Sequence, residues 1–149
     1  MRLADAPKRA VRSQFGALPW RIRNGKVEIL LITSRRTHRW ILPKGWPMHG
    51  ATPGEAAAKE AWEEAGVTGK VAEVPLGFYS YRKSHDEGEI PIIVAVFPLR
   101  VTDFHRKWPE RGQRKRRWVS RKKAAKLLSE PDLRHLLRAF DPRRATARR

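Results

Sequence analysis

The chain of 149 residues contains no cysteine. This absence excludes a disulfide framework, thiol catalysis and any zinc site built on cysteine. The chain also lacks an apolar run near the roughly 20 residues that a membrane-spanning helix needs. Its basic start, "MRLADAPKRAVRSQ", is not followed by the apolar stretch of a secretory signal. We therefore expect a soluble, cytoplasmic protein that does not act at a membrane.

Acidic residues are scarce as well. The 15 Asp+Glu residues face 33 Lys+Arg, which gives a formal net charge of +18. Such a balance indicates a polyanionic partner, and nucleic acid, an anionic membrane and highly phosphorylated small molecules all meet that description. Charge alone does not choose among them.

The length fits one compact domain with a hydrophobic core. We expect a folded domain over 13–140, preceded by a basic flexible segment (1–12) and followed by a basic flexible tail (141–149), because both ends are rich in Arg, Ala and Pro. "NGK" at 24–26 before the β-rich run 27–33 predicts a hairpin. Further strands are expected at 39–43, 70–81, 90–101 (a central strand) and 116–120, and helices at 121–130 and 131–140. This mixture predicts an α+β domain.

A further helix is predicted over about 53–65. Thr52 suits the N-cap, Pro53 suits the first helical position, and Glu55 completes a capping box. Gly66 supplies a left-handed stop after the last turn. The local signals for both ends of this helix are therefore present.

Three scarce carboxylates, Glu60, Glu63 and Glu64, fall on one face of that helix. Like charges at this spacing cost roughly 0.2–0.5 kcal/mol per pair when exposed, and Lys59 is the only cation in the helix. One interpretation is a solvated acidic face. The other is a divalent cation, because clustered carboxylates are hard oxygen ligands that suit Mg²⁺.

The loop before the helix favours the cation. Gly45 allows close backbone approach, and Lys44 can contact a phosphate. Carboxylates, Mg²⁺ (with Mn²⁺ as a substitute) and basic side chains together predict phosphoanhydride chemistry. We expect Glu60 and Glu64 to bind the metal and Glu63 to bind it or to position water as the base. A further acid or base could come from the loop 84–89 (His85, Asp86, Glu87 or Glu89), unless that loop is merely solvated.

The segment 45–67 resembles the signature of the Nudix hydrolases, G-x5-E-x7-R-E-U-x-E-E-x-G-U, where U is a bulky apolar residue. The matching positions are Gly45, Glu60, Glu63, Glu64, Gly66 and Val67. The departures are Ala51 for the first glutamate, Lys59 for the arginine and Ala61 for a larger apolar residue. The resemblance implies an α/β/α sandwich with a mixed β-sheet between helices, and a metal-dependent hydrolase.

Two departures bear on the chemistry. Ala51 removes a metal ligand or water-orienting group, and Glu55 offers a partial substitute unless the helix cap holds it. Lys59 keeps the charge of the arginine but loses its planar fork.

The resemblance extends to one branch, the diphosphoinositol polyphosphate phosphohydrolases. It is carried by "LLITSRRTHRWILPKG" (30–45), "GFYSYRK" (77–83) and "GQRKRRWVS" (112–120). It implies hydrolysis of diphosphoinositol polyphosphates or dinucleoside polyphosphates. The substrate-binding positions that it implies are Arg12, Arg35, Arg82 and Arg114. Lys44 and the backbone of Gly45 are expected, from their place before the helix, to hold the transferred phosphate.

Three alternatives stay open. The substrate could be a nucleoside triphosphate or an RNA 5′ end. The chain could be a non-catalytic ligand sensor, which Ala51 and Lys59 favour. It could instead bind nucleic acid through its basic ends, although no zinc-finger or RNA-recognition signature supports this. We expect Trp40, Trp46, Trp62 and Trp118 to pack in the core rather than to stack on bases.

Overall fold

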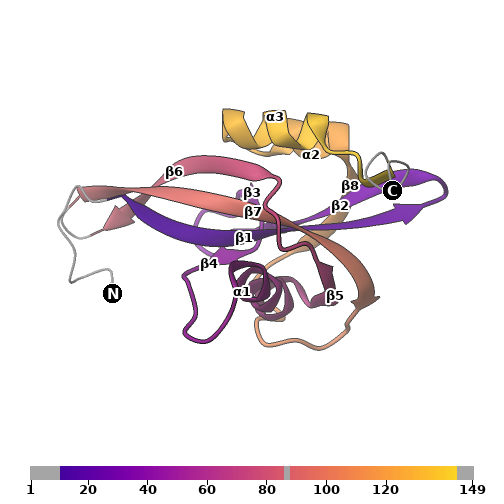
Figure 1. Cartoon of the computed structure of the whole chain (residues 1–149), viewed down its shortest axis with the longest axis horizontal. Helices are drawn as coiled ribbons and strands as arrows, with labels where there is room; N and C mark the ends of the chain where they lie inside the picture. The colour runs from indigo at the N-terminus through magenta and orange to yellow at the C-terminus, as the bar shows by residue number, and fades with distance from the viewer. Residues whose placement is uncertain (1–10, 86–87, 144–149) are drawn as a thin grey trace.

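The computed structural model describes residues 11–85 and 88–143. A mixed β-sheet lies between two layers of helix, with α2 and α3 over one face and α1 under the other (Figure 1). The predicted α/β/α sandwich is therefore confirmed. Most of the two predicted basic ends, 1–12 and 141–149, lies outside the described residues, so that division stays a prediction.

The elements follow the chain in a strand-rich order. The strands are β1 (Arg12–Arg23), β2 (Lys26–Thr33), β3 (Trp40–Ile41), β4 (Lys44–Gly45), β5 (Val67–Val71), β6 (Gly77–His85), β7 (Gly88–Phe104) and β8 (Arg116–Ser120). The helices are α1 (Pro53–Glu60), the π-helical turn η2 (Ala61–Ala65), α2 (Arg121–Leu127) and α3 (Pro131–Ala139). None of the described helices is long and apolar enough to span a membrane.

The sheet is built around β1 and β7, which pair in parallel. On its other side β1 pairs with β2, and β7 also pairs with β5 and β6, all antiparallel. The apolar run 90–101 was predicted to form a central strand, and β7 confirms it. The predicted hairpin is also present, since Asn24 and Gly25 take positive φ angles of 53° and 75° between β1 and β2.

Two predicted strands differ in extent. The segment 70–81 is divided between β5 and β6, because the chain bulges outward at Val74, which is 77% exposed, and Pro75 has no N–H to donate to a ladder. The strand expected at 39–43 shortens to β3. Lys44 and Gly45, which follow the predicted segment 39–43, form β4 and pair with β1. The loop expected to bind phosphate is thus anchored on the sheet.

The core has two parts, one on each face of the sheet. Beneath α2 and α3 it contains large aliphatic side chains such as Leu18, Ile92 and Leu133. On the α1 face the helix contributes alanines, Ala57 and Ala61 among them. Small side chains let the helix approach the sheet closely, and this brings its carboxylates to the end of β4.

Candidate active site

The helix that carries the carboxylates begins as predicted. The backbone N–H of Thr52 donates to Glu55 Oε1 (2.8 Å), and the N–H of Glu55 donates to Thr52 Oγ1 (3.1 Å), which completes the capping box. The cap therefore holds Glu55, and this carboxylate does not line the pocket described below. The structure gives no support to Glu55 as a substitute for the side chain missing at Ala51.

The end of the helix departs from a regular α-helix. The chain continues past Glu60 as the π-helical turn η2 and stops at Gly66, with φ 68°. Glu60 and Glu64 stay neighbours, since after burial and the opposing charge of Arg114 the proximity of Glu60 also raises the pKa of Glu64. Besides burial, the charge of Glu63 raises the pKa of Glu60, so Glu63 stays close to this pair. The three carboxylates therefore remain near one another, as the helical spacing predicts.

A cavity of about 620 Å³ opens beside this pair. Most of the side chains predicted for the site meet in its wall, and they come from strands, loops and the helix. The predicted residues that line it are Arg35, Lys44, Gly45, Glu60, Glu63, Glu64, Arg82 and Arg114. Arg36 and Arg39 line it as well, whereas Arg12 does not. We call this cavity the carboxylate pocket.

Glu64 is the most deeply placed of the three carboxylates, with 7% exposure. Its Oε1 accepts a hydrogen bond from the backbone N–H of Lys44 (3.4 Å) and lies 3.9 Å from Nη2 of Arg114. Burial raises the pKa of Glu64 to about 8, although the positive charge of Arg114 acts in the opposite direction. A divalent cation beside Glu64 would favour its ionised form.

Glu60 occupies space that a side chain at residue 45 would fill. A Cβ built on Gly45 would collide with the carboxylate of Glu60. Burial also raises the pKa of Glu60, and the neighbouring charge of Glu63 raises it further. The glycine of β4 thus makes room for the carboxylate.

Among residues 11–85 and 88–143, no three His, Cys, Asp or Glu side chains form a ready-made metal cluster. The donor set nevertheless fits Mg²⁺. The buried carboxylate of Glu64 and the half-buried carboxylate of Glu60 lie close together, and Gly45 leaves room for Glu60. Mg²⁺ is commonly bound by one or two carboxylates, with water and substrate phosphate completing its shell.

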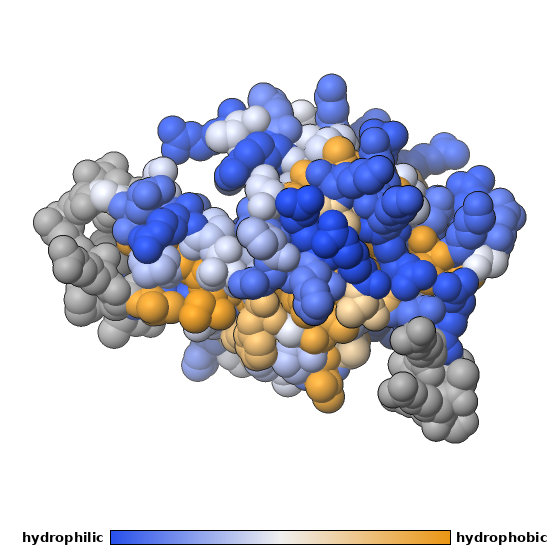
Figure 2. All heavy atoms as spheres, turned by 90° about the horizontal axis from the view of Figure 1, so that it is seen from above, coloured by the Kyte–Doolittle hydropathy of each residue, from blue (hydrophilic) through white to orange (hydrophobic). Residues whose placement is uncertain are grey.

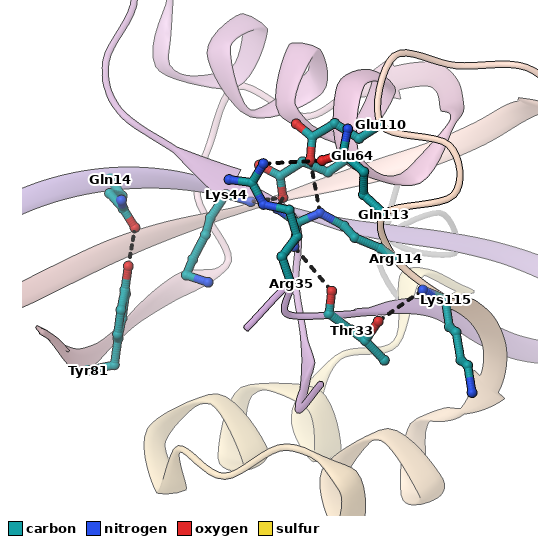
Figure 3. Close-up of polar contacts among 10 residues, drawn as sticks. All are labelled: Gln14, Thr33, Arg35, Lys44, Glu64, Tyr81, Glu110, Gln113, Arg114 and Lys115. Carbon is teal, nitrogen blue, oxygen red and sulfur yellow. Dashed lines mark hydrogen bonds and ion pairs between the residues drawn. The ribbon is translucent and has the colours of Figure 1, made fainter. Parts of the chain in front are cut away.

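Arg114 sits against this pair with only 9% of its side chain exposed. Its Nε donates to Glu110 Oε1 (3.0 Å), and its Nη1 donates to the carbonyl of Thr33 (3.1 Å). Figure 3 shows Arg114 between Glu110, Glu64 and Thr33. All three guanidinium nitrogens therefore face protein oxygens. Lys59, which takes the place of the signature arginine, is exposed and does not line the pocket.

Lys44 places its ammonium group on the opposite side of the pocket. Nζ lies 4.9 Å from the centre of the Tyr81 ring, whose hydroxyl donates to Gln14 Oε1 (2.7 Å; Figure 3). Burial lowers the pKa of Lys44 to about 8, while Glu64 and then Glu130 raise it. Lys44 therefore remains largely protonated at neutral pH.

Sequence reasoning missed several polar residues in the pocket wall, among them Gln14, Tyr81, Glu110 and Glu130. These four come from β1, β6, the loop after β7 and the residue before α3, and no local spacing links them. Of the loop 84–89, the side chain of His85 and residues Asp86 and Glu87 lie outside the described residues. Glu89 is exposed and does not line the pocket. Glu110 is the carboxylate that the structure brings beside the helix.

Arg116, in the basic segment "GQRKRRWVS" (112–120), contacts backbone carbonyls of the protein. Arg116 donates to the carbonyls of Ala65 (3.0 Å) and His105 (2.6 Å), and so binds the end of η2. Its guanidinium lies 3.6 Å from the Phe104 ring centre and 3.9 Å from that of Trp108.

The expectation for the tryptophans holds for Trp40 and Trp118, which pack against the core, and Trp62 packs edge-on against His105. It is wrong for Trp46, which is 37% exposed and lines the pocket.

The geometry agrees with a family comparison, in which the model of the NUDIX domain matches residues 13–140. The chain belongs to the Nudix family. The predicted family membership is thus confirmed, and the short sequence departures at Ala51, Lys59 and Ala61 occur within a recognisable Nudix domain.

Similar proteins include "Nudix hydrolase 12, mitochondrial" of Arabidopsis thaliana, which is 39% identical over 106 residues, covering 68% of this chain and 52% of the relative. "Diphosphoinositol polyphosphate phosphohydrolase 3-beta" of Homo sapiens is 35% identical over 104 residues, covering 68% and 60%. This Nudix chain thus spans about half the length of the first of these relatives. A C. elegans Ap4A hydrolase binary complex has the same fold, with a TM-score of 0.66, 24% identity, and coverage of 91% of this chain and 98% of that one.

Proposed function

We propose that this Nudix domain hydrolyses phosphoanhydride bonds in highly phosphorylated small molecules, with Mg²⁺ as its cofactor. The observation that supports the proposal is the pair of buried Glu64 and half-buried Glu60, which shares one cavity with Lys44 and a rim of arginines. Such a cavity offers oxygen ligands for a cation and donors for phosphate at the same time. The similarity to a Nudix hydrolase of Arabidopsis thaliana and to a human diphosphoinositol polyphosphate phosphohydrolase supports hydrolysis.

Glu60 and Glu64 would hold the cation, and Glu63 or Glu110 would complete its surroundings or orient the attacking water. When bound, Mg²⁺ supplies charge neutralisation on the phosphoryl oxygens and lowers the pKa of water. The protein must then fix the position of the phosphate, because phosphoryl transfer requires mainly positioning and charge stabilisation. Lys44 and the backbone of Gly45 are placed for this on β4.

We assign Arg114 a positioning role in place of the substrate contact that the resemblance implied. Its Nε and Nη1 donate to Glu110 and Thr33, and its Nη2 lies 3.9 Å from Glu64 Oε1. A guanidinium in this place helps to orient Glu64 and offsets its charge before the cation binds.

The basic rim supports a polyphosphorylated substrate. Four arginines line the cavity around the carboxylates: Arg35, Arg36, Arg39 and Arg82. Nη1 of Arg35 donates to Gln113 Oε1 (3.2 Å), which holds it at the mouth (Figure 3). Several guanidinium forks bind clustered phosphates by charge-assisted hydrogen bonds. We therefore favour diphosphoinositol polyphosphates, with dinucleoside polyphosphates as the second choice. A cytoplasmic location stays a prediction.

One observation favours another substrate class. Trp46 lies exposed in the pocket wall, where an indole can stack on a nucleobase. A nucleoside triphosphate or an RNA 5′ end is therefore the alternative.

The deciding experiment measures phosphate or pyrophosphate release with Mg²⁺ or Mn²⁺ from four substrates. They are a diphosphoinositol polyphosphate, a dinucleoside polyphosphate, a nucleoside triphosphate and 5′-triphosphorylated RNA. We expect the first or second to turn over fastest, with Trp46→Ala changing KM little. Turnover of only the third or fourth, with a large rise in KM for Trp46→Ala, would overturn the proposed substrate. No turnover of any of them would overturn the proposed activity.

A further inference from the structure

A second cavity, of about 440 Å³, lies away from the carboxylate pocket. Five of its seven lining residues are Lys or Arg, against 33 of 149 in the whole chain, and none of the seven is acidic. The five cations are Lys26, Arg121, Lys122, Arg138 and Arg143. We call this cavity the basic pocket. The fraction of Lys and Arg among its lining residues is therefore higher than in the chain as a whole.

The basic pocket is held together by arginine side chains bound to backbone carbonyls. Arg143 Nη1 donates to the carbonyl of Gly25 (2.9 Å), which ties the segment after α3 to the β1–β2 turn. Arg121 donates to the carbonyl of Phe140 and ties the start of α2 to the end of α3. The three segments that form the wall are therefore fixed to one another.

The positive charges in this wall are only partly balanced. Asp141 forms an ion pair with Arg143 at 3.0 Å. Within the described residues, Lys26, Lys122 and Arg138 form no ion pair with a carboxylate. Three like charges around one cavity repel each other, and an anion within it relieves that repulsion.

We propose that the basic pocket binds a compact anion with several phosphate groups. A cavity of this size, lined by the start of β2, the start of α2 and residues of and after α3, suits a small multivalent ligand better than a long polymer. The surrounding face, formed by α2 and α3, is mostly hydrophilic (Figure 2).

The two pockets are separate sites. Lys26 at the start of β2 lines the basic pocket, and Thr33 at its end binds Arg114 beside the carboxylates. An eight-residue strand spans about 23 Å at about 3.3 Å per residue, so one small ligand cannot reach both.

The test uses inositol hexakisphosphate, which has no anhydride bond and is therefore not consumed. Binding to the full chain is followed by calorimetry and by the amide resonances of Val27 and Ser120 at 0.15 M salt. The variant Lys122→Glu/Arg138→Glu removes two cations of the pocket. The variant Lys70→Glu/Arg106→Glu makes the same charge change at exposed positions that line neither pocket.

We expect the Val27 and Ser120 resonances to shift, and the pocket variant to weaken this binding at least about 10-fold. The control variant should weaken it by about 2-fold or less. Equal loss in both variants would show a general field effect and overturn the proposal, as would the absence of any shift at Val27 and Ser120. Shifts there with a single-stranded RNA but not with inositol hexakisphosphate would assign the surface to a polymer and also overturn it. None of these readouts depends on turnover, so a failure here is distinct from a failure of the proposed hydrolysis.

Discussion

The carboxylate pocket and the basic pocket each bring side chains of like charge together, and they differ in the source of the opposite charge. In the first, the carboxylates of Glu60 and Glu64 lie close together, and the charges of Arg114 and Lys44 act on Glu64. In the second, five cations share one wall, and the nearby Asp141 pairs with only one of them. The first pocket therefore contains much of its own counter-charge, whereas the second depends on a ligand to supply it.

This difference predicts how each pocket responds to substitution. Where the counter-charges belong to the protein, changing one group disturbs the geometry of the others and acts mainly on the rate. Where they belong to a ligand, changing one group alters affinity and leaves the rest of the fold in place.

The largest effect is expected for Glu64→Gln. The amide keeps the shape but removes the charge that would hold Mg²⁺, so kcat should fall about 10³-fold, at the upper end of what loss of one preorganised group costs. Single-turnover assays with Mg²⁺ measure this. Inositol hexakisphosphate should still shift the Val27 resonance, because the basic pocket is untouched. Turnover close to wild type would remove Glu64 from the proposed metal site.

A smaller loss is expected for Arg114→Lys. Lysine cannot contact Glu110, Thr33 and Glu64 together, so kcat should fall by about 10–100-fold, as is typical when a group that orients a metal ligand is lost, while KM changes little. Adding Lys59→Arg should restore part of kcat if the lost function is the placement of the carboxylates. A rise in KM alone, most marked at low salt, would restore Arg114 to the substrate contacts.

Gly45→Ala tests the space beside Glu60. The new methyl group would collide with the Glu60 carboxylate, so this side chain must turn away from Glu64. We expect Mg²⁺ affinity to fall about 10-fold, which calorimetry can measure, with unfolding still cooperative. Unchanged Mg²⁺ affinity would place the cation elsewhere in the pocket.

The smallest effect concerns pH and the metal-free protein. The pKa of Glu64 is about 8 in the folded chain, above the ordinary value of 4.5. The stability that this group contributes is complete below about pH 4.5 and is lost as the pH rises to about 8. Urea unfolding should show this slope, and Glu64→Gln should flatten it. Lys122→Glu/Arg138→Glu should leave the slope unchanged, and a slope equally steep in Glu64→Gln would assign it to another group.

Local signals predicted the helix of the site well. Thr52, Pro53 and Gly66 act within a few residues of themselves, so the ends of the helix could be read from the sequence. The strong hydrophobic run of β7 likewise identified a central strand. Elements of this kind depend mainly on neighbours along the chain.

The rest of the site depends on contacts between distant segments. Arg114 lines the pocket as predicted, but its hydrogen bond to the carbonyl of Thr33, 81 residues earlier, could not be predicted from the sequence. Glu110 and Glu130 enter the pocket because loops on different elements converge there. The π-helical turn gave no signal in the spacing, since Glu60 and Glu64 are neighbours in either type of helix. Such features follow only from the folded arrangement.

The clamp of Arg116 on the carbonyls of Ala65 and Gly66 has a consequence for how the protein is made. These contacts join residues 51 and 50 positions apart. A nascent chain that has emerged from the ribosome only as far as η2 already contains Glu60, Glu63 and Glu64, but it lacks Arg116 and the contacts that this side chain makes with η2. We therefore expect the end of the helix to be fixed only after β8 has been synthesised. A fragment that ends before Arg116 would contain the family signature without these contacts.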